Sequence, residues 1–366
     1  MLHCKLGIFK PRTLLWICLV GVTVSVYIAI QQDQLFSSIR KTHIDFRGDR
    51  GNTLKPSLHL HRLNRTRQIL IWNMPNNIYA PTTLDEKCGS CTITRNRKLA
   101  PESDAIVIHY RKIDSLPDPK TRRMNQLYVW LCRESAWTTK YKYKLDLKKY
   151  DGYFNSTMTF KLSSEFSQPY IEVLHRKLPN LDFDFVQLLQ NNVAEIISQK
   201  RYLVAWVVSN CVDTYGARRR FSLVHDLIQA GLHVQRFGRC FPETNFPSST
   251  DDASFIFLSK YKFYLAFENA FHCKDYITEK FWRSGLYSGV VPIVWGPSKE
   301  NIGRIAPKHS YIHVEDFPTL KALVTYLNYL NKNDTAYAEY FDWRKDLKNK
   351  IQENRYSTSL FARDAV

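Results

Sequence analysis

The chain has 366 residues and a formal net charge of +18, and 44% of its residues are hydrophobic. This length allows two domains of ordinary size with packed cores. The positive charge favours an anionic partner, such as nucleic acid, phospholipid head groups or a phosphorylated small substrate. The Lys and Arg residues are scattered, and no known nucleic-acid-binding motif accompanies them, so we expect no nucleic-acid partner.

An uncharged apolar run at Leu14–Ile30 is about as long as the shortest segments that span a bilayer. It follows three basic residues, Lys5, Lys10 and Arg12, which place the N-terminus on the cytoplasmic side. A cleaved signal peptide is the alternative, but no small-x-small cleavage site follows Ile30. We therefore predict a single-pass type II membrane protein with a lumenal remainder. The predicted order is a cytoplasmic tail, a membrane anchor and a polar stem, at 1–13, 14–30 and 31–66.

Lumenal exposure gives two kinds of residue a predicted role. Three Asn-X-Ser/Thr sequons are candidate N-glycosylation sites: Asn64, Asn155 and Asn333. The cysteines beyond the apolar run are candidates for disulfides, and their pairing stays open: Cys88, Cys91, Cys132, Cys211, Cys240 and Cys273. No second CxxC accompanies the Cys88–Cys91 pair, so a structural bridge is favoured over a zinc or redox site.

The folded part begins with apolar runs of strand length. They are predicted at Gln68–Trp72, Ala105–Tyr110 and Gln126–Cys132. Glu134 follows the third run, where a carboxylate is a candidate general base or else a salt-bridge partner of a nearby cation. The next loop, Trp137–Tyr153, is basic and aromatic, which suits either stacking on sugars or covering a core.

A second α/β unit follows, beginning near residue 200. We predict a helix at Asp184–Gln199, a strand at Tyr202–Val208, a helix at Phe221–Gln229 that is closed by Gly231, a strand at His233–Phe237, a strand at Tyr311–Val314 and a helix at Pro318–Asn331. This pattern is typical of a nucleotide-binding parallel sheet. The chain has no GxGxxG or Walker loop, so NAD-dependent and P-loop ATP chemistry are disfavoured.

The stretch from Tyr261 to Pro297 carries the strongest functional signal. Tyr261–Phe267 is an apolar run of strand length that leads into Glu268 and Asn269. We expect Asp275 to cap a helix after this loop, and Gly289 to end it before a strand at Val290–Trp295. Loops at strand carboxyl ends and helix N-termini bind phosphorylated ligands in open α/β sheets, and Lys280 would add a full positive charge there.

Four long runs resemble the α1,3-fucosyltransferase family: Ala205–Cys211 (AWVVSNC), Tyr261–Asn269 (YKFYLAFEN), Asp275–Trp282 (DYITEKFW) and Gly289–Ser298 (GVVPIVWGPS). Weaker similarities lie at Cys91–Arg97, Glu134–Ser135, Phe154–Phe160 and Tyr340–Arg344. The matches occur in family order across roughly residues 68 to 344. Ser156 is a departure, because it stands where the family commonly has a tryptophan that could stack on a sugar.

The resemblance implies a GT-B fold, in which two Rossmann-like domains face each other across a cleft. An acceptor-binding domain would span 67–198, a GDP-fucose-binding domain 199–335 and a C-terminal helix 336–366. The implied enzyme resides in the Golgi membrane and transfers L-fucose from GDP-fucose to N-acetylglucosamine of an N-glycan or glycolipid, inverting the anomeric centre.

The resemblance also assigns roles to single residues. Glu134 is implied as the catalytic base on the acceptor side. Five residues are implied in donor binding: Lys280 and Arg220 at the phosphates, and Asn269, Tyr276 and Glu279 around the fucose and nucleotide. No tightly bound metal is expected, although Mn²⁺ or Mg²⁺ could stimulate such an enzyme, and the acidic pair in Asp182–Asp184 fits a helix start better than a metal site.

Two other functions stay open from the sequence. One is a glycosyltransferase that uses another sugar nucleotide, and the other is a catalytically inactive relative that binds glycans. The acceptor also stays open among core chitobiose, N-acetyllactosamine and LacdiNAc.

Overall fold

The computed structural model describes residues 66–75, 91–111, 113, 115–170, 192–247 and 252–345. The predicted tail, anchor and nearly all of the stem lie outside these residues, as do Asn64, Cys88 and Asp182–Asp184. The C-terminal helix predicted at 336–366 is described only as far as residue 345. Within the described ranges, no helix combines the length and the apolar character that a membrane crossing requires.

The described chain contains two β-sheets, and every strand pairing with a described register is parallel. By packing, residues 66–131 and 152–157 form one compact unit, here the N-terminal unit. Residues 132–151, 158–170, 192–247 and 252–345 form the other, here the C-terminal unit. The α/β class predicted from the sequence is confirmed.

The first sheet has six strands in the order β2-β1-β3-β4-β5-β6. Their bounds are β1 Arg67–Asn73, β2 Cys91–Thr94, β3 Ala105–His109, β4 Leu127–Cys132, β5 Ser156–Thr159 and β6 Phe166–Ser167. Strands β3 and β4 are buried along their whole length, as their continuous apolar runs predict for a parallel sheet. Strands β2, β5 and β6 were not predicted, because their two to four residues carry too short a pattern.

The second sheet has five strands in the order β11-β10-β9-β7-β8. Their bounds are β7 Tyr202–Val207, β8 Val234–Phe237, β9 Tyr261–Phe267, β10 Val291–Trp295 and β11 Ile312–His313. The chain runs from β7 to the edge strand β8 and then crosses to the other side of β7 to form β9. Strand order therefore reverses between β7 and β9, and doubly wound sheets bind ligands at such a point, beyond the carboxyl ends of the strands.

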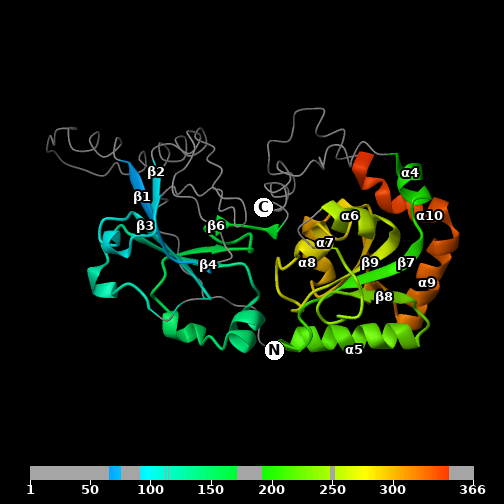
Figure 1. Ribbon diagram of the computed structural model, residues 1–366, viewed down its shortest axis with the longest axis horizontal. Coiled ribbons are helices and arrows are strands. Elements are labelled where there is room, and N and C mark those ends of the chain that lie inside the picture. The colour runs from blue at the N-terminus through cyan, green and yellow to red at the C-terminus, as the bar shows by residue number, and fades with distance from the viewer. Residues whose placement is uncertain are drawn as a thin grey trace, which may run out of the picture. The chain divides into compact units, whose positions relative to one another are not determined.

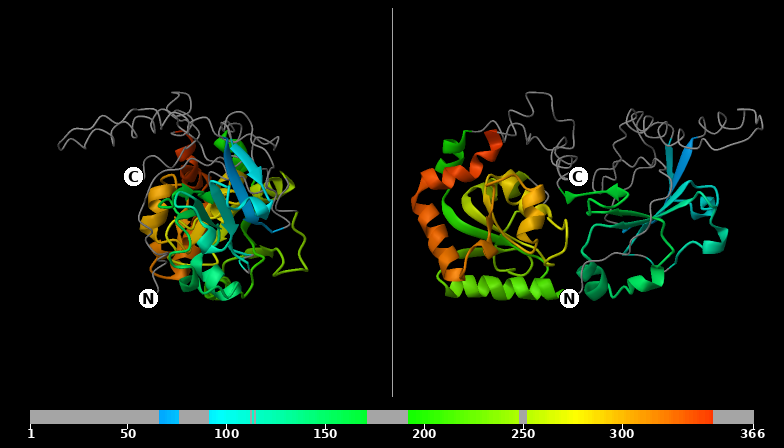
Figure 2. Two further views of the ribbon diagram at one scale, coloured as in Figure 1. Left: turned by 90° about the vertical axis from the view of Figure 1, so that its left-hand side faces the viewer. Right: turned by 180° about the vertical axis from the view of Figure 1, so that it is seen from behind.

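Helices cover both faces of the second sheet, which explains why its central strands β7, β9 and β10 are mostly apolar (Figures 1 and 2). On β9, Phe263, Leu265 and Phe267 pack with α5 and α9, while Tyr264 and Ala266 pack with α6, α7 and α8. The helices are α4 Val193–Ser198, α5 Tyr215–Gln229, α6 Asp252–Ser259, α7 Glu279–Trp282, α8 Lys299–Ile305, α9 Leu320–Lys332 and α10 Asp334–Ala338. Successive strand side chains point to opposite faces, so each strand supplies both cores.

Helix α5 begins earlier than its sequence pattern predicts. Thr214 caps it, and its hydroxyl accepts a hydrogen bond from the backbone N–H of Ala217. The arginines at 218–220 therefore lie on the helix, although the predicted helix began only at Phe221. The predicted end is confirmed, because Gly231 follows the helix with a φ of +99°.

Helix α7 is shorter than predicted, and its cap differs. It has four residues and is capped by Thr278, not by Asp275. Asp275 has a left-handed φ of +65°, and its carboxylate turns to α8, where it accepts from Asn301 at 3.0 Å and Arg304 at 3.2 Å. A single helical turn offers little dipole to a ligand, so any anion binding must rest on side chains. Gly289 does not end α7, which stops at Trp282; it ends a separate 3-10 turn at Leu286–Ser288, where it takes a left-handed conformation.

One disulfide, Cys211–Cys240, is described, and it ties the loop after β7 to the loop after β8. The bonded residues are 29 positions apart, so the bridge removes much loop-closure entropy from the unfolded chain. We expect replacement of both cysteines by serine to lower the free energy of unfolding by about 3 kcal/mol. Guanidinium unfolding of the oxidised full-length chain measures this, and reduction of the unmodified chain should reproduce the loss. An unchanged midpoint in both cases would contradict the prediction.

Candidate active site

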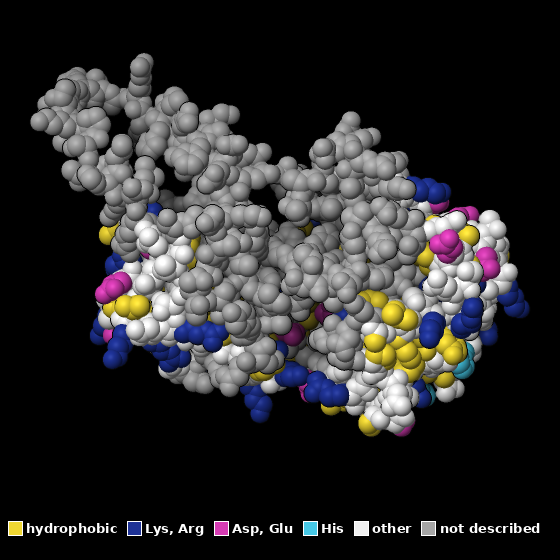
Figure 3. Space-filling view, turned by 45° about the horizontal axis from the view of Figure 1, so that its top comes forward, with side chains coloured by type: hydrophobic (Ala, Val, Ile, Leu, Met, Phe, Trp, Pro, Cys, Tyr) yellow, Lys and Arg dark blue, Asp and Glu magenta, His cyan; other side chains and the backbone are white. Residues whose placement is uncertain are grey.

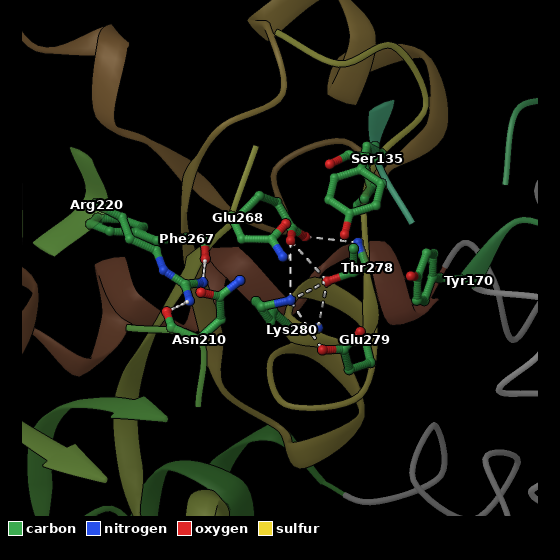
Figure 4. A network of polar contacts seen from close by, with 12 residues as sticks. Ser135, Tyr170, Asn210, Arg220, Phe267, Glu268, Thr278, Glu279 and Lys280 are labelled. Carbon is green, nitrogen blue, oxygen red and sulfur yellow. Dashed lines mark hydrogen bonds and ion pairs between the residues drawn. The ribbon is translucent and has the colours of Figure 1, made fainter. Parts of the chain in front are cut away.

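Polar side chains gather where strand order reverses, at the carboxyl ends of β7 and β9 (Figure 4). Arg220 reaches this point from α5 and is 1% exposed. Its guanidinium donates to the carbonyl of Phe267, at the end of β9, at 2.9 Å. It also donates to the carbonyl of Asn210, just after β7, at 2.7 Å. Arg220 therefore braces the two strand ends against each other.

This bracing role bears on the prediction that Arg220 contacts a phosphate. Burial lowers the pKa of the Arg220 guanidinium, while Glu268 opposes the shift. The Nε atom is buried and has no hydrogen-bond partner among the described residues. Two of its nitrogens donate hydrogen bonds to backbone carbonyls, so Arg220 supplies positive charge to the site from a buried position. A direct phosphate contact stays a prediction.

Asn269 lies beside this brace, in a loop whose backbone is held tightly. Its carbonyl accepts a hydrogen bond from the Thr214 hydroxyl at 2.7 Å. A Cβ atom on Gly216 would lie 2.4 Å from the same carbonyl oxygen, so only glycine fits there. The amide Oδ1 of Asn269 is buried and has no partner in the part of the chain described here. Such an atom is available to a ligand donor, which agrees with the predicted donor-binding role.

Lys280 is the centre of the densest polar network in Figure 4. Its ammonium lies 2.7 Å from the hydroxyl of Thr278, 3.0 Å from a carboxylate oxygen of Glu279 and 3.1 Å from one of Glu268. Burial lowers the pKa of Lys280, but the two carboxylates outweigh it and raise the pKa above its ordinary value. The lysine therefore holds its charge firmly at neutral pH.

The two carboxylates around Lys280 have different surroundings. Glu268 is 1% exposed and also accepts from the backbone N–H and hydroxyl of Thr278. Burial raises the pKa of the Glu268 carboxyl, although Lys280 opposes the shift. The side chain of Glu279 is 48% exposed. Desolvation raises the pKa of Glu279, but Lys280 outweighs this effect and lowers the pKa below its ordinary value.

Glu268 is the site residue that sequence reasoning did not assign. The available signal was its position immediately after β9, which placed it in the loop without a role. Its role depends on Thr278 and Lys280, which lie 10 and more positions further along the chain. The structure shows that it orients Lys280 and fixes the start of α7.

Glu134 is brought to this loop by Tyr276. The Tyr276 hydroxyl donates to a carboxylate oxygen of Glu134 at 3.2 Å, across 142 positions of sequence within the C-terminal unit. Burial, together with the Glu134 charge, raises the pKa of Tyr276 well above its ordinary value, so it remains a donor. Its ring packs edge-on against Phe160 at 4.9 Å. Tyr170 lies beside it and donates to the carbonyl of Arg133 at 2.7 Å.

Two of the predicted glycosylation sites are described. Asn155 is exposed, and its amide bridges the Tyr128 N–H and the Gln126 carbonyl. Asn333 is partly exposed and caps α10 by accepting from the Ala336 N–H. Their modification stays a prediction. Among the described residues, no group of three or more His, Cys, Asp and Glu side chains is placed to hold a metal ion.

Comparison with known proteins identifies the family. The sequence model described as "Glycosyltransferase family 10 (fucosyltransferase) C-term" matches residues 197–362. A second model, "Fucosyltransferase, N-terminal", matches residues 64–171. The chain belongs to glycosyltransferase family 10, the fucosyltransferases. The family predicted from the four sequence runs is thereby confirmed, and the chain is a glycosyltransferase by class.

Curated family 10 relatives agree with this assignment. Human 4-galactosyl-N-acetylglucosaminide 3-alpha-L-fucosyltransferase FUT6 is 37% identical over 76% of this chain and 73% of its own length. Human 4-galactosyl-N-acetylglucosaminide 3-alpha-L-fucosyltransferase FUT5 is 32% identical over 96% of this chain and 97% of its own length. Cattle 3-galactosyl-N-acetylglucosaminide 4-alpha-L-fucosyltransferase FUT3 is 37% identical over 77% and 72%.

A solved structure of an alpha1,3-fucosyltransferase with GDP-fucose is also similar. It has 19% identity and a TM-score of 0.49, and the match covers 81% of this chain and 85% of that one.

Proposed function

We propose that this family 10 enzyme transfers L-fucose from GDP-fucose in α1,3 linkage to N-acetylglucosamine of a glycoprotein or glycolipid glycan. The observation that carries the proposal is the hydrogen bond between Tyr276 and Glu134, which sets a carboxylate beside the polar loop at the switch point. Two of the relatives are named for 3-α-fucosylation of a galactosyl-N-acetylglucosaminide, which supports the linkage and the acceptor class.

The proposed reaction breaks the bond between fucose C1 and the β-phosphate oxygen of GDP. The bonding electrons leave with the diphosphate, which gains negative charge as the bond lengthens. Lys280 is held charged at the carboxyl edge of the sheet and is the group proposed to stabilise that charge. Arg220 adds positive charge from below, at the point where β7 and β9 diverge.

Glu134 is the proposed general base. An acceptor hydroxyl attacks C1 from the side opposite to the departing diphosphate, so the anomeric centre inverts. The proton of the acceptor hydroxyl passes to the Glu134 carboxylate as the new C–O bond forms. Tyr276 keeps the Glu134 carboxylate in place through its hydroxyl. The amide oxygen of Asn269, which has no partner among the described residues, and the half-exposed Glu279 are proposed to bind hydroxyls of the fucose and nucleotide.

The wider setting is proposed on the same basis. Two parallel α/β sheets are the parts a GT-B enzyme requires. The apolar run at 14–30 is proposed as the anchor of a type II Golgi membrane protein whose catalytic part is lumenal. On the face drawn in Figure 3, Lys and Arg side chains are scattered over the described surface. Such a surface suits an anionic small substrate.

One assay tests the proposed function directly. The purified full-length chain is given GDP-fucose or other sugar nucleotides with chitobiose, N-acetyllactosamine or LacdiNAc acceptors, with Mn²⁺, Mg²⁺ or a chelator. Fucose transfer from GDP-fucose with an α1,3 product linkage is the expected result. Transfer from another nucleotide alone would select a different donor, and glycan binding without turnover would select the inactive relative. Activity that survives the chelator would agree with the expected absence of a tightly bound metal.

Glu268 provides a prediction for donor binding. In Glu268→Gln, the amide can accept one hydrogen bond, but its NH₂ group would face the Thr278 donors or the Lys280 ammonium. We expect Lys280 to shift and the KM for GDP-fucose to rise about tenfold, because a buried charge-assisted network loses about 1.5 kcal/mol or more. Steady-state kinetics at saturating acceptor measure it. Glu195→Gln, an exposed carboxylate on α4, is the matched control, and equal donor KM values in both variants would contradict the prediction.

A further inference from the structure

Four aromatic rings form a stacked group next to the candidate active site, here the aromatic platform: Trp137, Tyr141, Tyr215 and Phe271. Trp137 lies at its centre. Its ring centroid is 5.1 Å from that of Tyr141, 6.0 Å from Tyr215 and 5.8 Å from Phe271, each at an interplanar angle of 28°. All four residues lie in the C-terminal unit.

The platform is open to solvent. Tyr141 is 44% exposed and Tyr215 is 49% exposed, and the neighbouring Val212 is 61% exposed. Large apolar side chains that cluster in contact and remain exposed mark a binding surface more often than a structural core. Charged side chains border the rings, since Lys140 lies 5.3 Å from the Tyr141 centroid and Lys142 pairs with Asp213.

One side of the platform is tied to Glu134. Trp137 precedes a π-helix at Thr138–Lys142, a rare element that is frequent at functional sites. The Ser135 side chain is buried and locks this turn, because its hydroxyl accepts from the Thr138 N–H at 3.2 Å and its carbonyl accepts from the Thr139 N–H at 3.1 Å. The indole therefore has a fixed place relative to the proposed base.

The other side is tied to the donor loop. Tyr215 is the first residue of α5, between Thr214 and Gly216, the two residues that contact the Asn269 carbonyl. Phe271 belongs to the same loop as Asn269 and also lies against Trp295, 6.0 Å between centroids. The platform thus joins the segment of the proposed base to the loop of the proposed donor site.

We propose that the aromatic platform binds a pyranose ring of the acceptor glycan, which makes Trp137 and Tyr215 determinants of acceptor affinity. The inference rests on the proposed function. One face of a pyranose carries C–H groups that pack on aromatic rings, while its hydroxyls reach a polar rim, and the platform offers both features. Trp137 would then supply an indole for sugar stacking at a different place from Ser156, where the sequence has none.

The test measures acceptor and donor constants separately in the full-length chain. We expect Trp137→Ala and Tyr215→Ala to raise the acceptor KM about tenfold or more, with the GDP-fucose KM changed less than about twofold, since buried Trp and Tyr anchors dominate binding surfaces. Trp137→Phe and Tyr215→Phe keep an aromatic face and should retain most of the affinity. Tyr202→Ala is the matched control. Tyr202 is 46% exposed and lies at the amino end of β7, whereas the site lies at the carboxyl ends of the strands.

Two outcomes overturn the inference. The first is an unchanged acceptor KM in Tyr215→Ala with a wild-type melting temperature. The second is a raised GDP-fucose KM alone, which would assign the platform to the guanine base. Saturation-transfer NMR of chitobiose, N-acetyllactosamine and LacdiNAc on the GDP-loaded chain gives a second readout that needs no turnover. If the wild type transfers no fucose, the proposed function fails, while loss of the NMR signal in Trp137→Ala would still support the platform.

Discussion

Lys280→Ala is expected to reduce fucose transfer by about 100-fold or more, with its main effect on kcat. The lysine ammonium is the most strongly held positive charge at the carboxyl edge of the second sheet, because two carboxylates raise its pKa. An alanine leaves the departing diphosphate without that charge. Lys280→Arg retains a cation with a different shape and should keep part of the activity.

The same substitution removes the partner of a buried carboxylate, so loss of activity must be separated from loss of the fold. Glu268 would remain in the interior without its cation, which is costly unless it takes up a proton. The double variant Lys280→Ala with Glu268→Gln removes both charges and should recover stability without recovering transfer. Lys321→Ala, an exposed lysine on α9, is the matched control. If the double variant were as active as the wild type, Lys280 would have no catalytic role.

Much of the second sheet can be predicted from the sequence, because each of its long strands is buried on both faces. Tyr202–Val207, Tyr261–Phe267 and Val291–Trp295 are runs rich in apolar residues, and they differ from the predictions by a residue at most. The helix that follows Thr214 starts early because nothing in the Arg218–Arg220 run prevents helix formation, whereas the predicted helix began at Phe221. Local pattern thus locates elements well and their ends less well.

The site required contacts that local pattern does not contain. Sequence reasoning placed Lys280 near a phosphate through a helix N-terminus, but α7 has only four residues and the lysine acts through its side chain. The hydrogen bond between Glu134 and Tyr276 joins residues 142 positions apart, and no periodicity in the sequence predicts such a pair. Glu268 received no role because its partners, Thr278 and Lys280, come from a later part of the chain that meets it only in the folded structure.

Glu134→Gln is expected to lower kcat by about 100-fold or more while both KM values change little. Glutamine has nearly the same shape, and its amide oxygen can still accept the hydrogen bond from Tyr276, so the site should stay assembled. What is lost is the ability to take the proton from the acceptor hydroxyl. Because glutamine does not titrate, the acid limb of the pH–rate profile should disappear with it.

Two variants show whether Glu134 acts as the base or only holds Tyr276. Tyr276→Phe keeps the ring packed on Phe160 and removes the hydroxyl, so it should lose less activity than Glu134→Gln and retain the acid limb. Glu195→Gln serves again as the exposed control. Turnover above about a tenth of the wild-type value in Glu134→Gln would require another base.

The Glu279 carboxylate also acts electrostatically on Tyr276, and its own surroundings argue against it as that base. Lys280 lies 3.0 Å from its carboxylate and outweighs the effect of burial, so the pKa of Glu279 is lowered. A lowered pKa makes a carboxylate a weaker proton acceptor. Glu134 instead accepts a hydrogen bond from a neutral phenol whose own pKa is raised. The two carboxylates therefore divide the work, with Glu279 and Lys280 at the donor and Glu134 at the acceptor proton.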